Sequence, residues 1–378
     1  MIKKQLLLTT IIFISLLLIP IWKYRSTFFT ATDIAKYAKL YAHSQYVLGE
    51  ASVQKIDDET LYVYAGFAYL QGEDPTTINF EHPPLGKYLF GLSYWLFHNA
   101  MLLNLIIYAG VLWLTYQLAN KLLTNQNLAI TAMVLVGGMK IFQIHTSHAL
   151  LDLQQLLVTL SFFWVLFSTH TKKFFWSSFL LGVLASIKYP FPLVGIFILI
   201  LAWWAAGEKQ WKKFIFSLPV MLIPYLLSYL VHFWYQPNPL EFLKFEWFRW
   251  RWWTGERTMP KFLIFQTLFR GKFMAWWAEG VFEQANSWTI FWPVIFIGQL
   301  FSLGWWRQAN QCILTIFVFA NGLLLLYAFG AAANERYLIQ LFPFWIILSL
   351  WGGKRLMAVV QKKRLAPNKP HGIEPKQL

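Results

Sequence analysis

Three consecutive acids, Asp57, Asp58 and Glu59, open the stretch "DDETLYVY". A carboxylate that is held partly away from water is suited to take a proton from a hydroxyl nucleophile. Acids at the start of a helix are also stabilised by the helix dipole, so helix capping is the alternative role. The run therefore predicts either a general base or the N-terminus of a helix.

A second charged stretch, "NFEHPPLGKY", follows about two dozen residues later. Its double proline forces an extended entry and can begin a helix, because proline is tolerated at the first helical position. Glu81 and His82 are thereby fixed just before that helix, and Lys87 falls about one turn inside it. We expect these three polar residues to serve a site, since the flanking stretches are strongly apolar.

The composition indicates the environment of these residues. Of the 378 residues, 57% are hydrophobic and 13% are charged, whereas soluble domains are about 25% charged. Several windows of nearly uncharged residues approach the roughly 20 that a helix needs to cross a bilayer, and they lack the alternation of a β-barrel. The chain is predicted to be an all-α polytopic membrane protein.

The ten predicted spans lie near 5–22, 100–120, 127–144, 150–168, 174–188, 192–206, 213–234, 286–304, 311–330 and 337–352. The first is interpreted as an uncleaved span, because no convincing small-residue cleavage site follows it. Ten spans place both termini on one side, and the loops of that side are rich in Lys and Arg, which indicates the cytoplasm. The same distribution explains the net charge of +15 without a nucleic-acid partner.

This topology gives a transmembrane domain over residues 1–352 and a basic cytoplasmic tail over 353–378. Two long segments, 23–84 and 236–285, then lie outside the cell membrane. Amphipathic helices are expected around 30–48 and 57–71 within the first of them.

Each short outer connection contains one basic residue: Lys140, Lys188 and Arg336 respectively. Basic residues on the translocated side oppose the topological bias. Either they extend to lipid headgroups, or an anionic ligand at the outer membrane surface requires them. The recurrence in all three connections favours the ligand.

Four motifs resemble those of a known family and follow one another in the same order as in that family. "FEHPPLGKY", after "DDE" and a single N-terminal span, resembles the first external loop of the dolichyl-phosphate-mannose protein mannosyltransferases of family 39 and the 4-amino-arabinose lipid A transferases of family 83. "HALLDLQQLL", "ASIKYPFPLV" and "NERYLIQLFPFW" are similar to later landmarks of these GT-C enzymes. The family often has an Arg shortly before the Asp of the second motif, and this chain has His145 and His148 instead.

The resemblance implies a GT-C fold of about ten transmembrane helices, with a large first extracytoplasmic loop that carries interfacial helices. It implies an inverting glycosyltransferase that moves a hexose or pentose from a polyprenyl-phosphate donor to a hydroxyl at the outer face of the membrane. The acceptor would be protein Ser/Thr, a lipid or an envelope glycan.

The same resemblance implies a role for each acidic residue. Asp58 is expected to be the base, with Asp57 as its close rival because "DDE" permits two alignments. Glu59 would orient the base or pair with a cation. Asp152 would be a second acid that positions the acceptor or the sugar, unless it caps a helix or pairs with a cation.

The leaving phosphate gains negative charge and needs fixed cations. We expect Arg336 first, because a guanidinium fork matches phosphate oxygens, together with Lys188 and then Lys87 or Lys140. Tyr337 would donate a further hydrogen bond or anchor the chain at the interface.

Glu81 and His82 would position the acceptor or the sugar. Alternatively, Glu81 with a histidine from elsewhere would hold a divalent metal, as the matching Glu does in the lipid A transferases. Two ligands fall short of a site, and no other cofactor is expected.

Two other classes compete with this interpretation: a membrane transporter or channel, and an inactive relative that binds lipid carriers. Transporters place charges near the bilayer midplane, whereas here they fall at the ends of spans on one face. The complete "DDE" and "EHPPLGK" motifs argue for an active enzyme.

Overall fold

The computed structural model describes residues 2–188, 191–255, 260–275, 280–330 and 334–365. These residues are almost entirely helical, and they include one antiparallel hairpin of two short strands, β1 (Lys272–Met274) and β2 (Phe282–Gln284). The all-α class expected from the composition is therefore confirmed.

The described residues contain four helices that are long and apolar enough to cross a membrane: α1 (Ile2–Lys23), α8 (Leu102–Leu123), α20 (Gln311–Phe329) and α21 (Phe342–Leu365). A fifth span results if α9 (Gln126–Gly138) and α10 (Lys140–Ser147), which are bent by 58° to each other, are taken together. The chain is thus a multi-pass helical protein by length and composition.

The remaining expected spans are helical but shorter or interrupted. Three are continuous apolar helices: α11 (Asp152–Leu166), α12 (Lys173–Ile187) and α13 (Phe191–Gly207). The segment expected at 213–234 is divided into α14 (Trp211–Ser217), the 3₁₀ turn η2 (Leu218–Met221), α15 (Leu222–Ser228) and α16 (Leu230–Tyr235). Pro219 and Pro224 lie in this segment, and proline interrupts a helix because it lacks an N–H and crowds the preceding turn.

Aromatic side chains pack between the long helices of the bundle. Phe163 of α11 packs edge-on against Phe319 of α20, with ring centroids 4.8 Å apart, and against Phe344 of α21 at 5.2 Å. Phe197 of α13 also meets Phe319, at 5.1 Å. Edge-to-face pairs of this kind add to the gain from apolar burial, so these rings tie four helices into one core.

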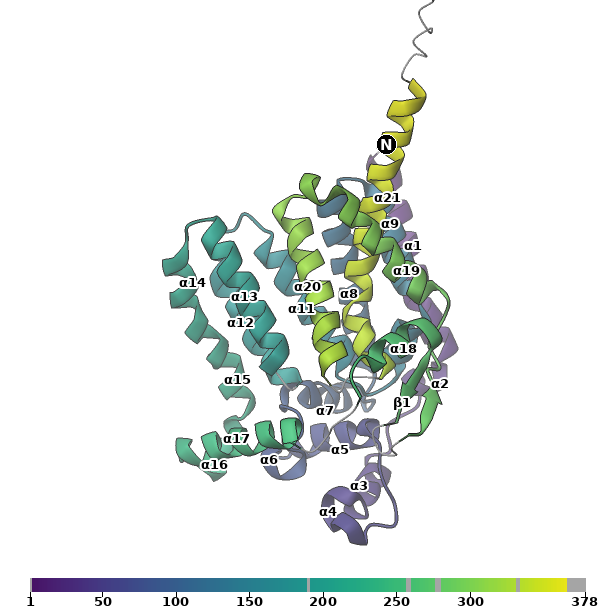
Figure 1. The fold of residues 1–378 in the computed structure, drawn as a ribbon. Coiled ribbons are helices and arrows are strands. Elements are labelled where there is room, and N and C mark those ends of the chain that lie inside the picture. Colours follow the sequence, from purple (N-terminus) through teal and green to yellow (C-terminus); the bar gives the residue numbers. More distant parts are fainter. Residues whose placement is uncertain (1, 189–190, 256–259, 276–279, 331–333, 366–378) are drawn as a thin grey trace, which may run out of the picture.

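A layer of shorter helices covers one end of this bundle (Figure 1). It consists of α3 (Ile34–Ala42), α4 (Gln45–Leu48), α5 (Asp58–Leu70), α6 (Pro75–Ile78), α7 (Leu85–Phe97) and α17 (Pro239–Gly255). The start of α1 and the end of α21 lie at the opposite end (Figure 1). The helices expected around 30–48 and 57–71 correspond to α3 with α4 and to α5.

The remaining elements are short, apart from α19 (Phe291–Leu300), which packs against α21. They are α2 (Arg25–Phe29), η1 (Gly49–Ala51), α18 (Leu263–Arg270), α19, η3 (Phe301–Gln308) and η4 (Glu335–Gln340). The last of them is a 3₁₀ turn that precedes α21, so this helix begins five residues later than the span expected from 337. Asn334 caps the turn by accepting a hydrogen bond from the backbone N–H of Arg336 at 3.0 Å.

Helices α5 and α7 cross at two glycines. A Cβ atom built on Gly66 would lie 2.2 Å from the carbonyl oxygen of Lys87, and one built on Gly91 would lie 2.1 Å from the carbonyl oxygen of Gly66. No side chain fits at these distances, so glycine is what allows the two backbones to touch. This contact sets the position of α5 and of the acids at its start.

We expect Gly66→Ala to lower the apparent melting temperature of the detergent-purified protein, because its methyl group must push α5 and α7 apart. Overpacking of this kind costs about 1–3 kcal/mol. The control is Gly322→Ala in α20, where a Cβ meets nothing within 4 Å, and it should melt at or slightly above the wild-type temperature. Intrinsic tryptophan fluorescence reports both, and equal melting of the two variants would contradict the tight crossing.

Candidate active site

The best-positioned acid of the "DDE" run is Asp58, the first residue of α5. Its Oδ2 accepts a hydrogen bond from Nη1 of Arg336 in η4 at 2.5 Å, across 278 positions of sequence. The side chains are 24% and 18% exposed, respectively. This ion pair is therefore mostly enclosed but still open to an incoming group.

A second ion pair lies deeper, between Lys188 at the end of α12 and Asp152 at the start of α11. The Lys188 side chain is 8% exposed and the Asp152 side chain 2%. The backbone oxygen of Asp152 also accepts a hydrogen bond from Nε2 of Gln340 at 2.7 Å. Charged groups that are this buried need a partner of opposite charge, and Lys188 and Asp152 serve as partners for each other.

The ring of Tyr337 connects the two ion pairs. Nζ of Lys188 lies 4.9 Å from the ring centroid, and the guanidinium carbon of Arg336 lies 5.7 Å from it. Cations are attracted to an aromatic face at these distances. Asp58, Arg336, Asp152, Lys188 and Tyr337 together are called the charge cluster below.

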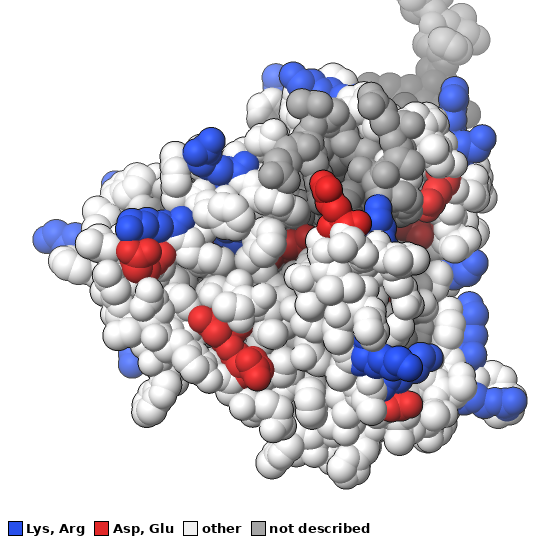
Figure 2. Space-filling view, turned by 90° about the horizontal axis from the view of Figure 1, so that it is seen from below, with Lys and Arg blue, Asp and Glu red and all other residues white. Residues whose placement is uncertain are grey.

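On the face formed by the layer of short helices, basic side chains are spread mainly around the edge (Figure 2). Acidic side chains also lie toward the middle of this face, with a basic side chain between them (Figure 2). Ionised groups of both signs thus meet at one end of the bundle.

Asp57 and Glu59 have environments that differ from that of Asp58. Asp57 caps α5, because its Oδ1 accepts a hydrogen bond from the backbone N–H of Thr60 at 2.8 Å. Oε1 of Glu59 lies 3.9 Å from Nε2 of His148, and each of these side chains is 37% exposed. Burial raises the pKa of Glu59 to about 7, and the nearby Asp57 adds to this shift while His148 opposes it.

Lys87 is fully buried and serves the loop that precedes α7. Its Nζ donates to the carbonyl oxygens of His82 at 2.5 Å and Asn79 at 3.3 Å, and lies 5.8 Å from the ring centroids of Tyr62 and Tyr69. Burial lowers the pKa of Lys87 well below its usual value. The ammonium thus holds the "NFEHPP" loop in place.

Lys140 is similarly engaged with backbone. Its Nζ donates to the carbonyl oxygen of Asn286 at 2.5 Å, which ties the start of α10 to the segment before α19. Of the four cations expected at a phosphate, the structure therefore brings Lys188 and Arg336 together and gives Lys87 and Lys140 carbonyl partners.

Glu81 and His82 lie against α17. The His82 ring stacks on Trp253 of α17, with centroids 5.1 Å apart, and the Trp253 indole N–H donates to the Glu81 carbonyl oxygen at 2.8 Å. Tyr46 donates to the Glu81 carboxylate at 3.4 Å. Neither Trp253 nor Tyr46 was expected here, because nothing in their spacing separates them from the many other aromatic residues.

His145 and His148, which precede Asp152, both bond to backbone within α10. Nδ1 of His145 lies 2.9 Å from the carbonyl oxygen of Ile141 in its own helix. Nδ1 of His148 lies 2.8 Å from the carbonyl oxygen of Ile144, which leaves Nε2 to face Glu59. His148 is thus the polar residue that the sequence placed near Asp152 and the structure places near the acids of α5.

A divalent metal does not fit this arrangement. In the described ranges no three His, Cys, Asp or Glu side chains come together in a way that could hold an ion. The Glu81 carboxylate is bonded to Tyr46 and the His82 ring lies against Trp253. The ligands that zinc or manganese would need are not assembled around Glu81.

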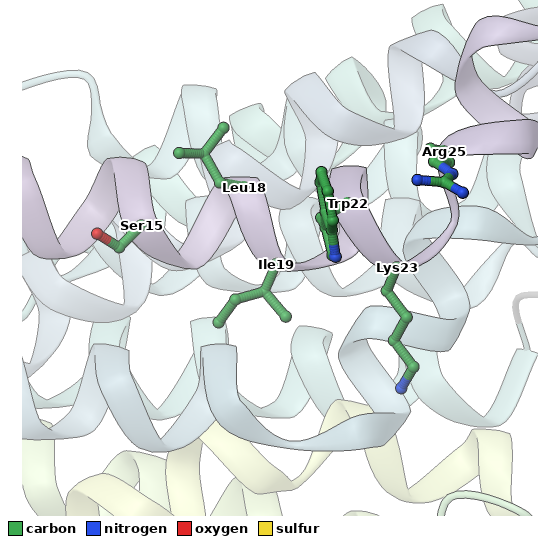
Figure 3. Close-up of a pocket in the computed structure, with 6 residues that line it drawn as sticks. All are labelled: Ser15, Leu18, Ile19, Trp22, Lys23 and Arg25. Carbon is green, nitrogen blue, oxygen red and sulfur yellow. The ribbon is translucent and has the colours of Figure 1, made fainter.

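An open groove of about 940 Å³ runs along the outer surface of α1 and the start of α2 (Figure 3). Its lining residues are Ser15, Leu18, Ile19, Trp22, Lys23 and Arg25. Tyr24, at the same end of α1, packs edge-on against His148 with ring centroids 6.4 Å apart. The groove therefore ends close to the Glu59 side of the site.

Glu59 predicts a pH dependence of stability. Its pKa is about 7 in the fold against an ordinary 4.5, so the folded protein binds the extra proton between these values. Its stabilising contribution is complete below about pH 4.5 and is lost as the pH rises through 7. We expect Glu59→Gln, which mimics the protonated acid, to melt close to wild type at pH 5 and above it at pH 8.

Melting curves at the two pH values check this expectation. Asp33→Asn, at the exposed cap of α3, is the control. Its melting temperature should differ from that of wild type by the same amount at pH 5 and at pH 8. If Glu59→Gln follows wild type in parallel from pH 5 to pH 8, the environment assigned to Glu59 is wrong.

No protein-family model and no curated protein sequence matches the chain. Two crystal structures of ArnT from Cupriavidus metallidurans are similar to it. The structure in the apo state has a TM-score of 0.57 and 14% identity and covers 82% of this chain, and that bound to undecaprenyl phosphate has a TM-score of 0.58 and 15% identity and covers 88%.

The chain spans 57% and 62% of the length of these two ArnT chains. At such low identity the likeness shows the fold alone. The GT-C fold that the four sequence motifs imply is thereby confirmed as a structural similarity to ArnT over most of the chain.

Proposed function

We propose that this protein is an inverting glycosyltransferase that moves a sugar from a polyprenyl-phosphate carrier to a hydroxyl acceptor at the outer face of the cell membrane. The observation that carries the proposal is the charge cluster, where the partly exposed Asp58–Arg336 pair and the buried Asp152–Lys188 pair lie on either side of Tyr337 at one end of the bundle. The complex of ArnT with undecaprenyl phosphate supports a lipid carrier of this kind.

The reaction needs two opposite kinds of group. The acceptor oxygen attacks the anomeric carbon from the side opposite the phosphate, and the bond from that carbon to the phosphate oxygen breaks. The acceptor's proton passes to the carboxylate of Asp58, and the bonding electrons leave with the phosphate. Arg336 and Lys188 stabilise the charge that develops there, as fixed cations do in an enclosed site.

The surrounding residues position these groups. Asp57 caps α5 and so holds Asp58 in its first turn. Tyr337 lies against both cations, and Asp152 fixes Lys188. Lys87, through the carbonyl oxygens of the "NFEHPP" loop, holds Glu81 and His82, which we assign to acceptor or sugar binding.

The membrane arrangement follows from the same assignment. We propose that the ten helical segments cross or enter the membrane and that both termini are cytoplasmic, so the layer with α5 and α7 is extracytoplasmic. The groove on α1 offers Leu18, Ile19 and Trp22 to an apolar chain, and Lys23 and Arg25 to an anionic headgroup. A lipid carrier would approach the charge cluster along this side.

Transfer assays with purified protein test the proposal. Polyprenyl phosphates bearing different radiolabelled sugars are incubated with protein, lipid and glycan acceptors from the cell envelope. We expect wild type to transfer one of the sugars, and Asp58→Asn to lower the rate by about 10²- to 10⁴-fold, the usual contribution of a general base.

Asp57→Asn is the matched control, because asparagine caps a helix about as well as aspartate. It should keep most of the transfer activity. Equal rates for wild type and Asp58→Asn would contradict the assigned base, and no transfer from any carrier by wild type would contradict the function.

A further inference from the structure

Arg336 has two features that bear on how the proposed reaction is controlled. Its Nη1 is bonded to the carboxylate assigned as the base. Its Nε is buried and has no hydrogen-bond partner among the described residues. The guanidinium therefore holds Asp58 by one edge while another of its N–H donors is unsatisfied.

This contact opposes the role of Asp58 as a base. Oδ2 of Asp58 already accepts a hydrogen bond from Nη1 of Arg336, so this oxygen is not free to accept one from a hydroxyl group. The carboxylate must therefore leave Arg336, at least in part, before it can take a proton from a hydroxyl group.

A phosphate is a suitable competitor for Arg336. The planar guanidinium binds two phosphate oxygens through parallel N–H bonds, whereas Asp58 accepts from Nη1 through one of its two oxygens. The Asp58–Arg336 pair is 24% and 18% exposed, whereas Lys188 and Asp152 are 8% and 2% exposed. An incoming anion thus meets the Arg336 pair more readily than the Lys188 pair.

We propose that the donor phosphate displaces Asp58 from Arg336, so that binding of the lipid carrier releases the base. The inference rests on the proposed function and adds an order to it: the donor binds before the acceptor is deprotonated. Lys188 keeps Asp152 throughout and adds its charge beside the phosphate, while Tyr337 remains against both cations. The exchange breaks no covalent bond and moves no proton.

The exchange predicts that removing the competing carboxylate tightens phosphate binding. Undecaprenyl phosphate, without a sugar, is titrated into wild type, Asp58→Asn and Asp58→Ser in nanodiscs of neutral lipid. We expect both variants to bind it roughly two- to fivefold more tightly than wild type, the factor that corresponds to a partly exposed ion pair. Melting curves verify that each variant is folded. If only one of the two Asp58 variants folds, that variant alone is enough for the test.

Two comparisons separate partner exchange from a general loss of negative charge. Asp57→Asn removes a charge from the adjacent position and keeps the cap, so it should bind undecaprenyl phosphate as wild type does. In an Arg336→Gln background, Asp58→Asn should no longer change the affinity.

The outcomes are distinguishable. Equal or weaker binding by the Asp58 variants, an equal gain in Asp57→Asn, or a gain that persists without Arg336 would each overturn the exchange. If wild type does not bind undecaprenyl phosphate at all, the proposed function fails instead.

Discussion

The ion pair between Asp58 and Arg336 is the contact on which the arrangement of the site depends. It joins the first turn of α5, in the first long segment outside the bundle, to η4, which lies between α20 and α21. A partly exposed ion pair of this kind contributes about 0.2–1 kcal/mol. The layer of short helices is therefore held against the bundle by electrostatics as well as by the apolar contacts beneath it.

Two further lysines at the same end of the molecule have backbone carbonyl oxygens as partners. Nζ of Lys87 donates to two carbonyl oxygens, and Nζ of Lys140 donates to a third. Backbone carbonyls satisfy the hydrogen bonds of an ammonium but supply only partial charge. These two lysines thus fix the "NFEHPP" loop and the start of α10 around the charge cluster, and neither is placed to bind an anionic ligand directly.

The sequence predicted the kinds of group at this site better than their contacts. The acids of "DDE", the cations at 188 and 336 and the covering helices were all expected, because composition and span boundaries place them near one membrane surface. Which acid meets Arg336 depends on where α5 begins, and that is settled by the hydrogen bond from Thr60 to Asp57. The carbonyl partners of Lys87 were not predictable, since position along a helix does not determine where a long flexible side chain ends.

The membrane spans show a similar limit. The apolar runs located helices throughout the chain, but length alone did not reveal the 58° bend between α9 and α10 or the division of the segment around Pro219 and Pro224. The bend places the start of α10, and therefore Lys140, beside the segment before α19. Interruptions of this kind bring polar residues of several helices to one end of the bundle.

The two acids of the charge cluster illustrate how burial separates structural from chemical roles. Asp152 is almost fully enclosed with Lys188, and its backbone oxygen is also held by Gln340. Exchange of its partner would expose a buried charge at high cost. Asp58 has the same chemistry and a cation of equal charge, but its greater exposure lets solvent or a ligand compensate the charge when the pair opens. A carboxylate that must change partners during a reaction belongs at the more open of the two positions, and Asp58 occupies it.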